Sequence, residues 1–148
     1  MLSHGHMDHF GALIPTLHSL PRKPVPLYVH PSAFKENRYL KVGEIRVKFP
    51  PADRAAWEEA GARITESRGP TLLADGTVLF LGEIERVTDF ERGMPNAYCE
   101  RDGEECWDPI EEDTAIVMNL RGKGLVVLSG CAHSGIVNTV AYARKVTG

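Results

Sequence analysis

The chain has 148 residues, of which 43% are hydrophobic and 25% charged, and its formal net charge is −3. These values are ordinary for one globular domain that buries a single sizeable core. They argue against a basic surface that tracks nucleic-acid phosphates, and no apolar run approaches the roughly 18 residues of a membrane span.

The first residues, MLSHGHMDH, lack the basic and apolar segments of a secretion signal. The three cysteines, Cys99, Cys106 and Cys131, form neither zinc-type pairs nor an even disulfide set. We therefore expect a reduced, cytoplasmic setting, in which Cys99 and Cys106 pair only if the fold brings them together.

The first half of the chain alternates helices with strands. Apolar residues at helical spacing predict a short helix over 8–20, directly after a histidine-rich loop. Further expected elements, in chain order, are a buried strand over 25–30, a helix start at Pro31, a strand over 43–49 and an amphipathic helix over 51–62.

The second half is expected to consist mostly of strands. Val, Ile, Leu and Thr dominate three segments, and the DG and RGKG sequences within two of them signal tight turns. A long acidic stretch is expected to be irregular, and Ser134 is a candidate N-cap for a final helix. The strand segments are 62–67, 71–84 and 114–130, the irregular stretch is 88–113 and the helix is 134–146. Because helices and strands interleave, the class is mixed α and β.

The histidine-rich loop, HGHMDH, is the strongest functional signal in the chain. His4 and His6 are two residues apart, so their rings point the same way in an extended segment. Asp8 and His9 follow where the helix begins, and Gly5 permits a tight path between the histidines. Imidazole and carboxylate groups bind zinc and related ions, so one such loop can serve two metals about 3.5–4 Å apart. A polar turn that merely happens to be rich in histidine is the alternative.

The stretch SHGHMDHFGAL resembles the HxHxDH signature of the metallo-β-lactamase superfamily. The resemblance implies an α+β fold, a four-layer αββα sandwich with the site at one edge of two packed sheets. It also implies a further histidine after a later strand, and GLVVLSGCAHSGI supplies His133 in that setting. The alternative for His133 is a histidine near a helix N-terminus with no ligand role.

By this resemblance, His4, His6 and His133 hold a first metal ion, and Asp8 and His9 contribute to a second. Three histidines with one open position form the ligand pattern of a catalytic zinc. The implied cofactor is one or two Zn²⁺ ions, with Mn²⁺ or Fe²⁺ as alternatives. Asp8 is the candidate catalytic residue, because it can orient a hydroxide or accept its proton.

Longer stretches narrow the resemblance to one subgroup. LSGCAHSGIVNTV, FPPADRAA…GEIERVTDFERG and EEDTAIVMNLRGKGLVVLSGCAH resemble dihydropterin–ribofuranosyl-aminobenzene phosphate synthase-like proteins. The resemblance implies a metal-dependent hydrolase whose activated water attacks an ester or phosphoester. The other implied reaction is a transfer that condenses a dihydropterin with a ribofuranosyl-aminobenzene phosphate. The expected partner is a small-molecule substrate, which can be phosphorylated. Nucleic acid and membranes are not expected partners.

The sequence also departs from the superfamily pattern. There, strands precede the histidine signature and a last histidine follows the helix after GCAHSGI, whereas here the signature begins at residue 3 and no later histidine follows His133. Residues 1–148 are therefore expected to form a partial metallo-β-lactamase domain. Its open apolar faces and strand edges invite aggregation or pairing with a second copy.

Two functional expectations follow from that departure. The second metal, left with Asp8 and His9, is expected to be weakly held, and the isolated chain is expected to be a poor catalyst. A truncated, non-catalytic metal-binding remnant is the alternative to an enzyme.

Other residues have a structural interpretation beside a functional one. His30 is expected in the core or a turn, and His18 on a solvated helix face. Cys131 is expected to be a small buried thiol, with a metal-adjacent thiolate as the alternative. The acidic run 111–113 is expected to be a solvated face or to support a ligand histidine. Aromatic residues of 88–113, namely Phe90, Tyr98 and Trp107, cover either the substrate or a small satellite core.

Overall fold

The computed structural model describes the whole chain, residues 1–148, as four helices, one 3-10 helix and ten strands. The helices are α1 (Met7–Phe10), α2 (Leu13–Ser19), α3 (Arg54–Glu59), α4 (Ile136–Thr147) and the 3-10 helix η1 (Pro31–Phe34). The strands are β1 (Val25–Val29), β2 (Arg38–Val42), β3 (Ile45–Lys48), β4 (Ala62–Glu66), β5 (Thr71–Leu73), β6 (Val78–Phe80), β7 (Ala97–Arg101), β8 (Glu104–Trp107), β9 (Ala115–Leu120) and β10 (Gly124–Ser129). No helix is both long and apolar enough to cross a bilayer.

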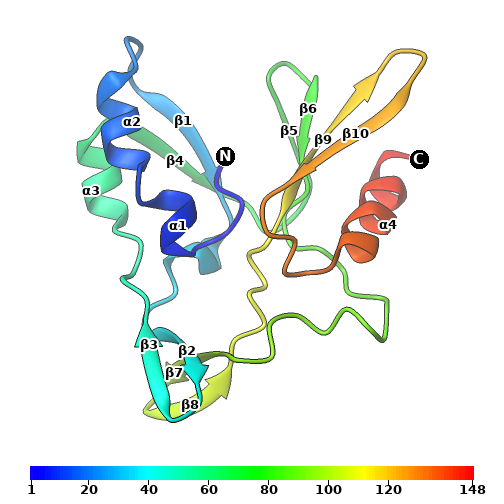
Figure 1. Cartoon of the computed structure of the whole chain (residues 1–148). Helices are drawn as coiled ribbons and strands as arrows, with labels where there is room; N and C mark the ends of the chain where they lie inside the picture. Colours follow the sequence, from blue (N-terminus) through cyan, green and yellow to red (C-terminus); the bar gives the residue numbers. More distant parts are fainter.

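The elements stack as α, β, β and α layers (Figure 1). Helices α1, α2 and α3 lie beside a sheet of two parallel strands, β1 and β4, and α4 lies beside an antiparallel sheet of order β10-β9-β6-β5. A third antiparallel sheet, of order β3-β2-β7-β8, lies at one end of the stack. The mixed class and the αββα layering expected from the sequence are both present.

The buried apolar side chains form two separate clusters, one in each half of the stack. The first surrounds Trp57, which is 2% exposed, and the rings of Phe10 and Phe34 lie 5.5 and 5.3 Å from its ring. The second lies between β9 and α4 and includes Val117 and Ala143. Each β layer is therefore stabilised by its own helices.

Apolar side chains also remain exposed on the strands. Leu72, Leu128 and Ile45 are 66%, 59% and 66% exposed. These residues lie on β5, β10 and β3, which are not neighbours in any sheet, and isolated exposed apolar residues are normal. The open apolar faces expected from the sequence, and pairing with a second copy, both stay predictions.

The N-terminal segment lies between the two β layers. The amide of Leu2 donates to the carbonyl of Tyr28 in β1 at 2.9 Å, and the amide of Thr114, just before β9, donates to the carbonyl of Ser3 at 2.9 Å. The histidine loop begins at the next residue. It therefore starts where the two halves of the molecule meet.

The helix predicted over 8–20 is wrong as one element, because α1 and α2 are separated at Gly11 and Ala12. Pro15 has no N–H to donate to the carbonyl of Gly11, and its ring crowds that carbonyl. Gly11 is itself a weak helix former. The break leaves α1 as a single turn that carries Asp8 and His9.

The remaining predicted elements are largely confirmed, with shorter bounds, but the acidic stretch 88–113 is not irregular throughout. It contains the hairpin β7–β8, whose turn residues Asp102 and Gly103 both have positive φ, 55° and 83°. An Asp-Gly pair is the same signal that predicted the turn between β5 and β6 from the sequence. Strand β2 was also not predicted, and Pro31 begins a 3-10 helix.

The cap of α4 differs from the prediction as well. Gly135, and not Ser134, is the N-cap residue, and it offers no side chain to the first turn. The carboxylate of Glu91 accepts from the amides of Val137 and Asn138 at 2.9 and 2.8 Å. The helix start is therefore satisfied by a residue from the distant 88–113 stretch.

Replacing Trp57 by Ala is expected to lower the free energy of unfolding by about 3–5 kcal/mol, because it empties the centre of the first apolar cluster. Urea unfolding of the purified chain measures the loss. Trp107, which is 41% exposed, is the matched control, and its replacement by Ala should cost less than half as much. Equal losses at the two positions would contradict this description of the core.

Cys99 and Cys106 are directly opposite each other on β7 and β8, with their Sγ atoms 3.1 Å apart, and both are free thiols. The fold therefore brings the two thiols together, which was the condition for their pairing. On exposure to oxidised glutathione, we expect a disulfide between these two cysteines. Peptide mass mapping without reduction identifies the link, and a link that uses Cys131 instead would show the prediction wrong.

Candidate metal centre

His4, His6 and His133 come together in space although the sequence separates them widely. The ring centroids are 4.7 Å apart for His4 and His6, 4.8 Å for His4 and His133, and 5.0 Å for His6 and His133. One nitrogen of each ring lies within 4.8 Å of the others. The first two rings come from the segment before α1, and the third comes from the loop between β10 and α4.

These imidazoles carry buried nitrogen atoms with no partner. Nε2 of His6 and Nε2 of His133 have no hydrogen-bond partner in the protein. Burying a polar atom unpaired costs about 1–3 kcal/mol, so such atoms call for an explanation. Three imidazole nitrogens that face one another are a known zinc ligand set. The residues present therefore fit a divalent metal ion.

Burial keeps the three rings neutral. It lowers the pKa of His4 to about 2 and the pKa of His6 to about 4, and positive neighbours add to both shifts. Burial also lowers the pKa of His133. At neutral pH all three imidazoles are therefore uncharged, which is the state in which an imidazole nitrogen binds a metal.

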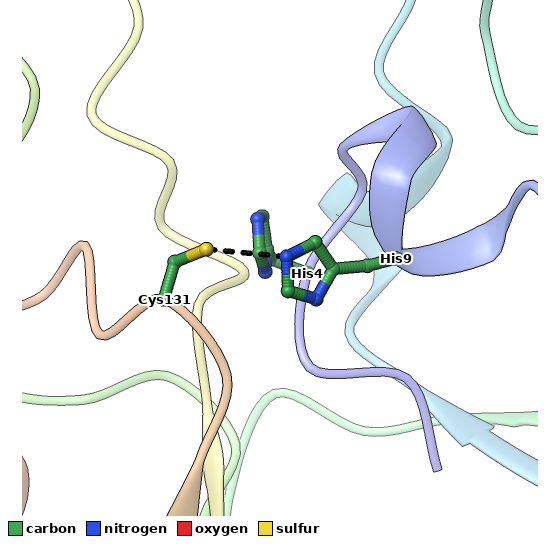
Figure 2. A group of neighbouring side chains, drawn as sticks. All are labelled: His4, His9 and Cys131. Atoms are coloured by element: carbon green, nitrogen blue, oxygen red, sulfur yellow. Dashed lines mark hydrogen bonds between the residues drawn. The ribbon is translucent and has the colours of Figure 1, made fainter.

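A second cluster of donor atoms lies beside the first. Figure 2 shows the side chains of His9 and Cys131 meeting, with Cys131 Sγ 3.1 Å from His9 Nε2. The ring of His4 lies alongside, with its centroid 4.0 Å from that of His9. Asp8 Oδ2 lies 3.5 Å from the same His9 nitrogen. The expectation of a small buried thiol is wrong, because Cys131 is exposed and contacts His9.

A buried ion-pair network fixes the backbone of the histidine loop. Arg38 Nη1 donates to Glu112 Oε1, and Arg38 Nε donates to Asp108 Oδ2 at 2.6 Å. The amide of Gly5 donates to the same Glu112 oxygen at 3.2 Å. None of the three side chains is more than 3% exposed. Because each buried charge is paired, the network holds the loop between His4 and His6 in one position.

The sequence gives no direct sign of this network. Glu112 and Asp113 belong to the acidic run 111–113, and both are 0% exposed, so the solvated-face interpretation is wrong for them. Asp113 Oδ2 accepts from the amide of Ser134 at 2.9 Å, one residue after His133. The acidic run therefore supports the loops that carry the histidines, which is the second of the two interpretations.

The other histidines have the structural roles expected of them. His30 is 1% exposed, and its Nδ1 accepts from the amide of Ser32 at the start of η1. His18 lies on the exposed side of α2. Neither belongs to a cluster of metal-ligating groups.

A surface cavity of about 490 Å³ lies next to His133. Phe90, Arg92 and Met94 contribute to its wall, and Phe90 is 68% exposed. Of the three aromatic residues expected near substrate, Phe90 alone lines this cavity. Tyr98 stacks on Tyr39 and Trp107 donates to the carbonyl of Met94, so both stabilise the third sheet and its surroundings.

The arrangement of layers is that of a known protein. The crystal structure of Tm1679, a metal-dependent hydrolase of the β-lactamase superfamily, superposes with a TM-score of 0.72 at 24% identity. The match covers 99% of this chain and 51% of that one. The chain has the metallo-β-lactamase fold.

Two curated relatives carry the same resemblance in sequence. The 7,8-dihydropterin-6-methyl-4-(β-D-ribofuranosyl)-aminobenzene-5'-phosphate synthase of Methanocaldococcus jannaschii is 30% identical over 156 aligned residues, covering 100% of this chain and 51% of the relative. The uncharacterized protein MJ0448 of the same organism is 28% identical over 153, covering 99% of this chain and 52% of the relative. No family model matches the chain.

The comparisons confirm the resemblance to the metallo-β-lactamase superfamily and to the synthase. The chain spans about half the length of the curated relatives it matches. The relatives with named activities are enzymes, a synthase and a metal-dependent hydrolase. The metal ligands and the reaction of this chain stay predictions.

Replacing Gly5 by Ala is expected to weaken zinc binding by more than tenfold, because a Cβ there would lie 2.5 Å from Ala33 O and 2.9 Å from Arg38 Nη1. The loop must shift to relieve that contact, and the two flanking histidines shift with it. Competition with a chelator measures the zinc affinity. Gly69, where a Cβ meets nothing within 4 Å, is the matched control. Unchanged affinity in Gly5→Ala would contradict the described packing.

The metal-free protein is expected to lose stability as the pH falls below about 6.5, the ordinary histidine pKa. His4 and His6 have folded-state pKa values lowered to about 2 and about 4, so the unfolded chain binds more protons in this range. Urea unfolding of chelator-treated protein between about pH 7 and about pH 5 measures the slope. Replacing His4 and His6 by Asn should flatten it, whereas replacing the exposed His18 should not.

Proposed function

We propose that the chain is a metal-dependent enzyme unit that hydrolyses an ester or phosphoester bond of a small molecule. The observation that carries the proposal is the convergence of three neutral, buried imidazoles, two of which have an unpartnered Nε2. Such a set binds a divalent ion without any change in the protein's protonation state near neutral pH.

His4, His6 and His133 would hold the ion, with zinc as the first candidate and manganese or iron as alternatives. A divalent ion in such a site supplies Lewis acidity and a hydroxide nucleophile near neutral pH. Glu112 and Asp113 act through the backbone, because they fix the two loops that carry the three histidines.

Asp8 is the proposed proton acceptor. Its side chain is 73% exposed, and its Oδ2 lies 3.5 Å from His9 Nε2. An exposed carboxylate at the edge of the imidazole cluster is free to accept a proton and pass it to water.

The cavity next to His133 is the proposed substrate site. Arg92 brings a positive charge to its wall, and Phe90 offers an exposed ring. This combination suits a substrate that joins a planar group to a phosphate.

A second candidate function is the synthase reaction, in which a dihydropterin condenses with a ribofuranosyl-aminobenzene phosphate. The observation that favours it is the 30% identity to the Methanocaldococcus jannaschii synthase along the full length of this chain. Both substrates named in that reaction contain a flat ring system, and one carries a phosphate, so the same cavity suits them. The two candidates share the metal centre and differ in the acceptor, which is water in the first.

Elemental analysis after size-exclusion chromatography tests the shared metal centre. The wild-type chain should retain at least one divalent ion, and His133→Ala should retain one ion fewer, because it removes one of three ligands. His18→Ala is the matched control, since His18 is exposed and outside the cluster. Ion content unaffected by His133→Ala would rule out this centre.

A chromogenic phosphodiester tests the reaction. We expect slow hydrolysis that a chelator abolishes and zinc restores, with at least a tenfold loss in His133→Ala and in Asp8→Asn. Product formation only when a pterin and an aminobenzene phosphate are supplied together would favour the synthase reaction. Hydrolysis that persists in the chelator would contradict a metal-dependent mechanism.

A further inference from the structure

A second cavity, of about 790 Å³, has no wall in common with the three histidines. Much of its lining comes from the segment that joins β6 to β7, which passes the start of α4 and leads to the β7–β8 hairpin (Figure 1). The hairpin and the residues after it supply most of the rest. The cavity shares only Glu91 and Arg92 with the cavity next to His133, and no histidine or cysteine lines it. Its chemistry is therefore separate from that of the candidate metal centre.

The acidic side chains that line this cavity all have partners in the protein. Glu111 and Glu85 each accept from a lysine ammonium that lies outside the cavity, at 2.8 and 2.7 Å. Glu91 accepts from the first amides of α4, and Glu83 lies 3.6 Å from the guanidinium of Arg68. Their negative charges are therefore compensated before any ligand enters.

The basic side chains are compensated less fully. The arginines that line the cavity are Arg68, Arg86, Arg92 and Arg101. Of these, only Arg68 forms an ion pair. Arg86 Nη2 donates instead to the carbonyls of Pro109 and Ile110. A carbonyl oxygen positions a guanidinium but, unlike a carboxylate, carries no charge that offsets it. The cavity therefore has a surplus of positive charge, which attracts an anion.

Arg86 lies close to an exposed aromatic ring. A Cβ on Gly93 would be 3.1 Å from Arg86 Nη1 and 3.1 Å from Trp107 Cζ2, so only a glycine leaves room for both side chains there. All the hydrogen bonds of the Arg86 side chain use Nη2, which leaves Nε and Nη1 without a partner in the protein. Trp107 is 41% exposed, and its ring nitrogen is bonded to the carbonyl of Met94. The surroundings therefore fix both groups and leave donor atoms and ring surface available.

We propose that this cavity binds an aromatic phosphate monoester, with the phosphate on Arg86 and the ring against Trp107. A guanidinium donates paired hydrogen bonds to phosphate oxygens, and the charge of Arg101 adds to the attraction. A flat ring gains contact area and a favourable stacking geometry on an indole. Because no metal-ligating side chain lines the cavity, binding there does not require a metal ion. The site therefore goes beyond the proposed function and does not depend on it.

Isothermal titration calorimetry with phenyl phosphate tests the proposal on the chelator-treated full chain. We expect phenyl phosphate to bind at least tenfold more tightly than inorganic phosphate or phenol, because each of these lacks one of the two recognised groups. His133→Ala should bind phenyl phosphate as the wild type does, since His133 is not part of this cavity.

Variants of the lining locate the ligand. Arg86→Gln should weaken phenyl phosphate binding at least tenfold, because it removes the charged donor. Arg101→Gln should weaken it at least threefold, and it tests the same charge without disturbing the fold, because Arg101 is exposed and forms no ion pair. Trp107→Leu should abolish the preference for phenyl phosphate over inorganic phosphate. Arg121→Gln, in the exposed turn between β9 and β10, is the matched control and should have no effect.

Several results would overturn the proposal. Phenyl phosphate that binds only in the presence of zinc, or that no longer binds to His133→Ala, would belong to the metal centre and not to this cavity. Equal affinity in the wild type and in both Arg86→Gln and Arg101→Gln would show that the arginines do not hold the ligand. Equal binding of phenyl phosphate and inorganic phosphate would contradict the role of Trp107. Absence of binding would reject the site and leave the three-histidine centre as a separate question.

Discussion

The bond from the Gly5 amide to the Glu112 carboxylate is the contact on which the candidate site depends. It joins the backbone between two buried histidines to a side chain from a segment more than a hundred residues later in the chain. Burial raises the pKa of Glu112, and the paired Arg38 guanidinium opposes that rise. The Glu112 carboxylate therefore stays charged only because Arg38 is paired with it. The buried Arg38 guanidinium is in turn also paired with Asp108. Removing one member of such a network leaves a buried charge without a partner, which costs more than the pair contributes.

The acidic stretch 88–113 supplies most of the supports around the site. Asp108 and Glu112 belong to it, and so does Glu91, which satisfies the first amides of α4. Phe90 and Arg92, on either side of Glu91, line the cavity next to His133. The position of the cavity wall is therefore coupled to the start of α4, and so to the loop that carries the third histidine.

The sequence predicted which histidines come together at the candidate site but not the residues that support them. HGHMDH and the strand-to-helix position of His133 pointed to residues that the structure brings within contact of one another. These signals are local, because spacing along a short segment decides where their side chains point. Arg38 and Glu112 gave no such signal, since an isolated arginine and an acidic run are usually solvated. Their burial depends on pairing across the fold, which no local pattern reveals. The contact of Cys131 with His9 is of the same kind. By contrast, the sequence of the β7–β8 hairpin does contain a local signal, the Asp-Gly pair of its turn. The prediction of an irregular stretch followed the acidic composition of 88–113 and missed that signal.

The two separate apolar clusters have a consequence for how the protein unfolds. His4, His6 and His9 lie on the segment that packs with the first cluster, and His133 lies on the loop leading into the helix of the second. A metal ion held at the proposed site from both sides would act as a cross-link between the two halves, whose apolar clusters are separate. Ligand binding to the folded state raises its stability, and here the added stability would lie at the contact between the two halves. With metal bound, the two halves would be expected to unfold together in one cooperative transition. After chelation, each half would be expected to have its own transition, so a chelator would act on the cooperativity of folding as well as on the chemistry.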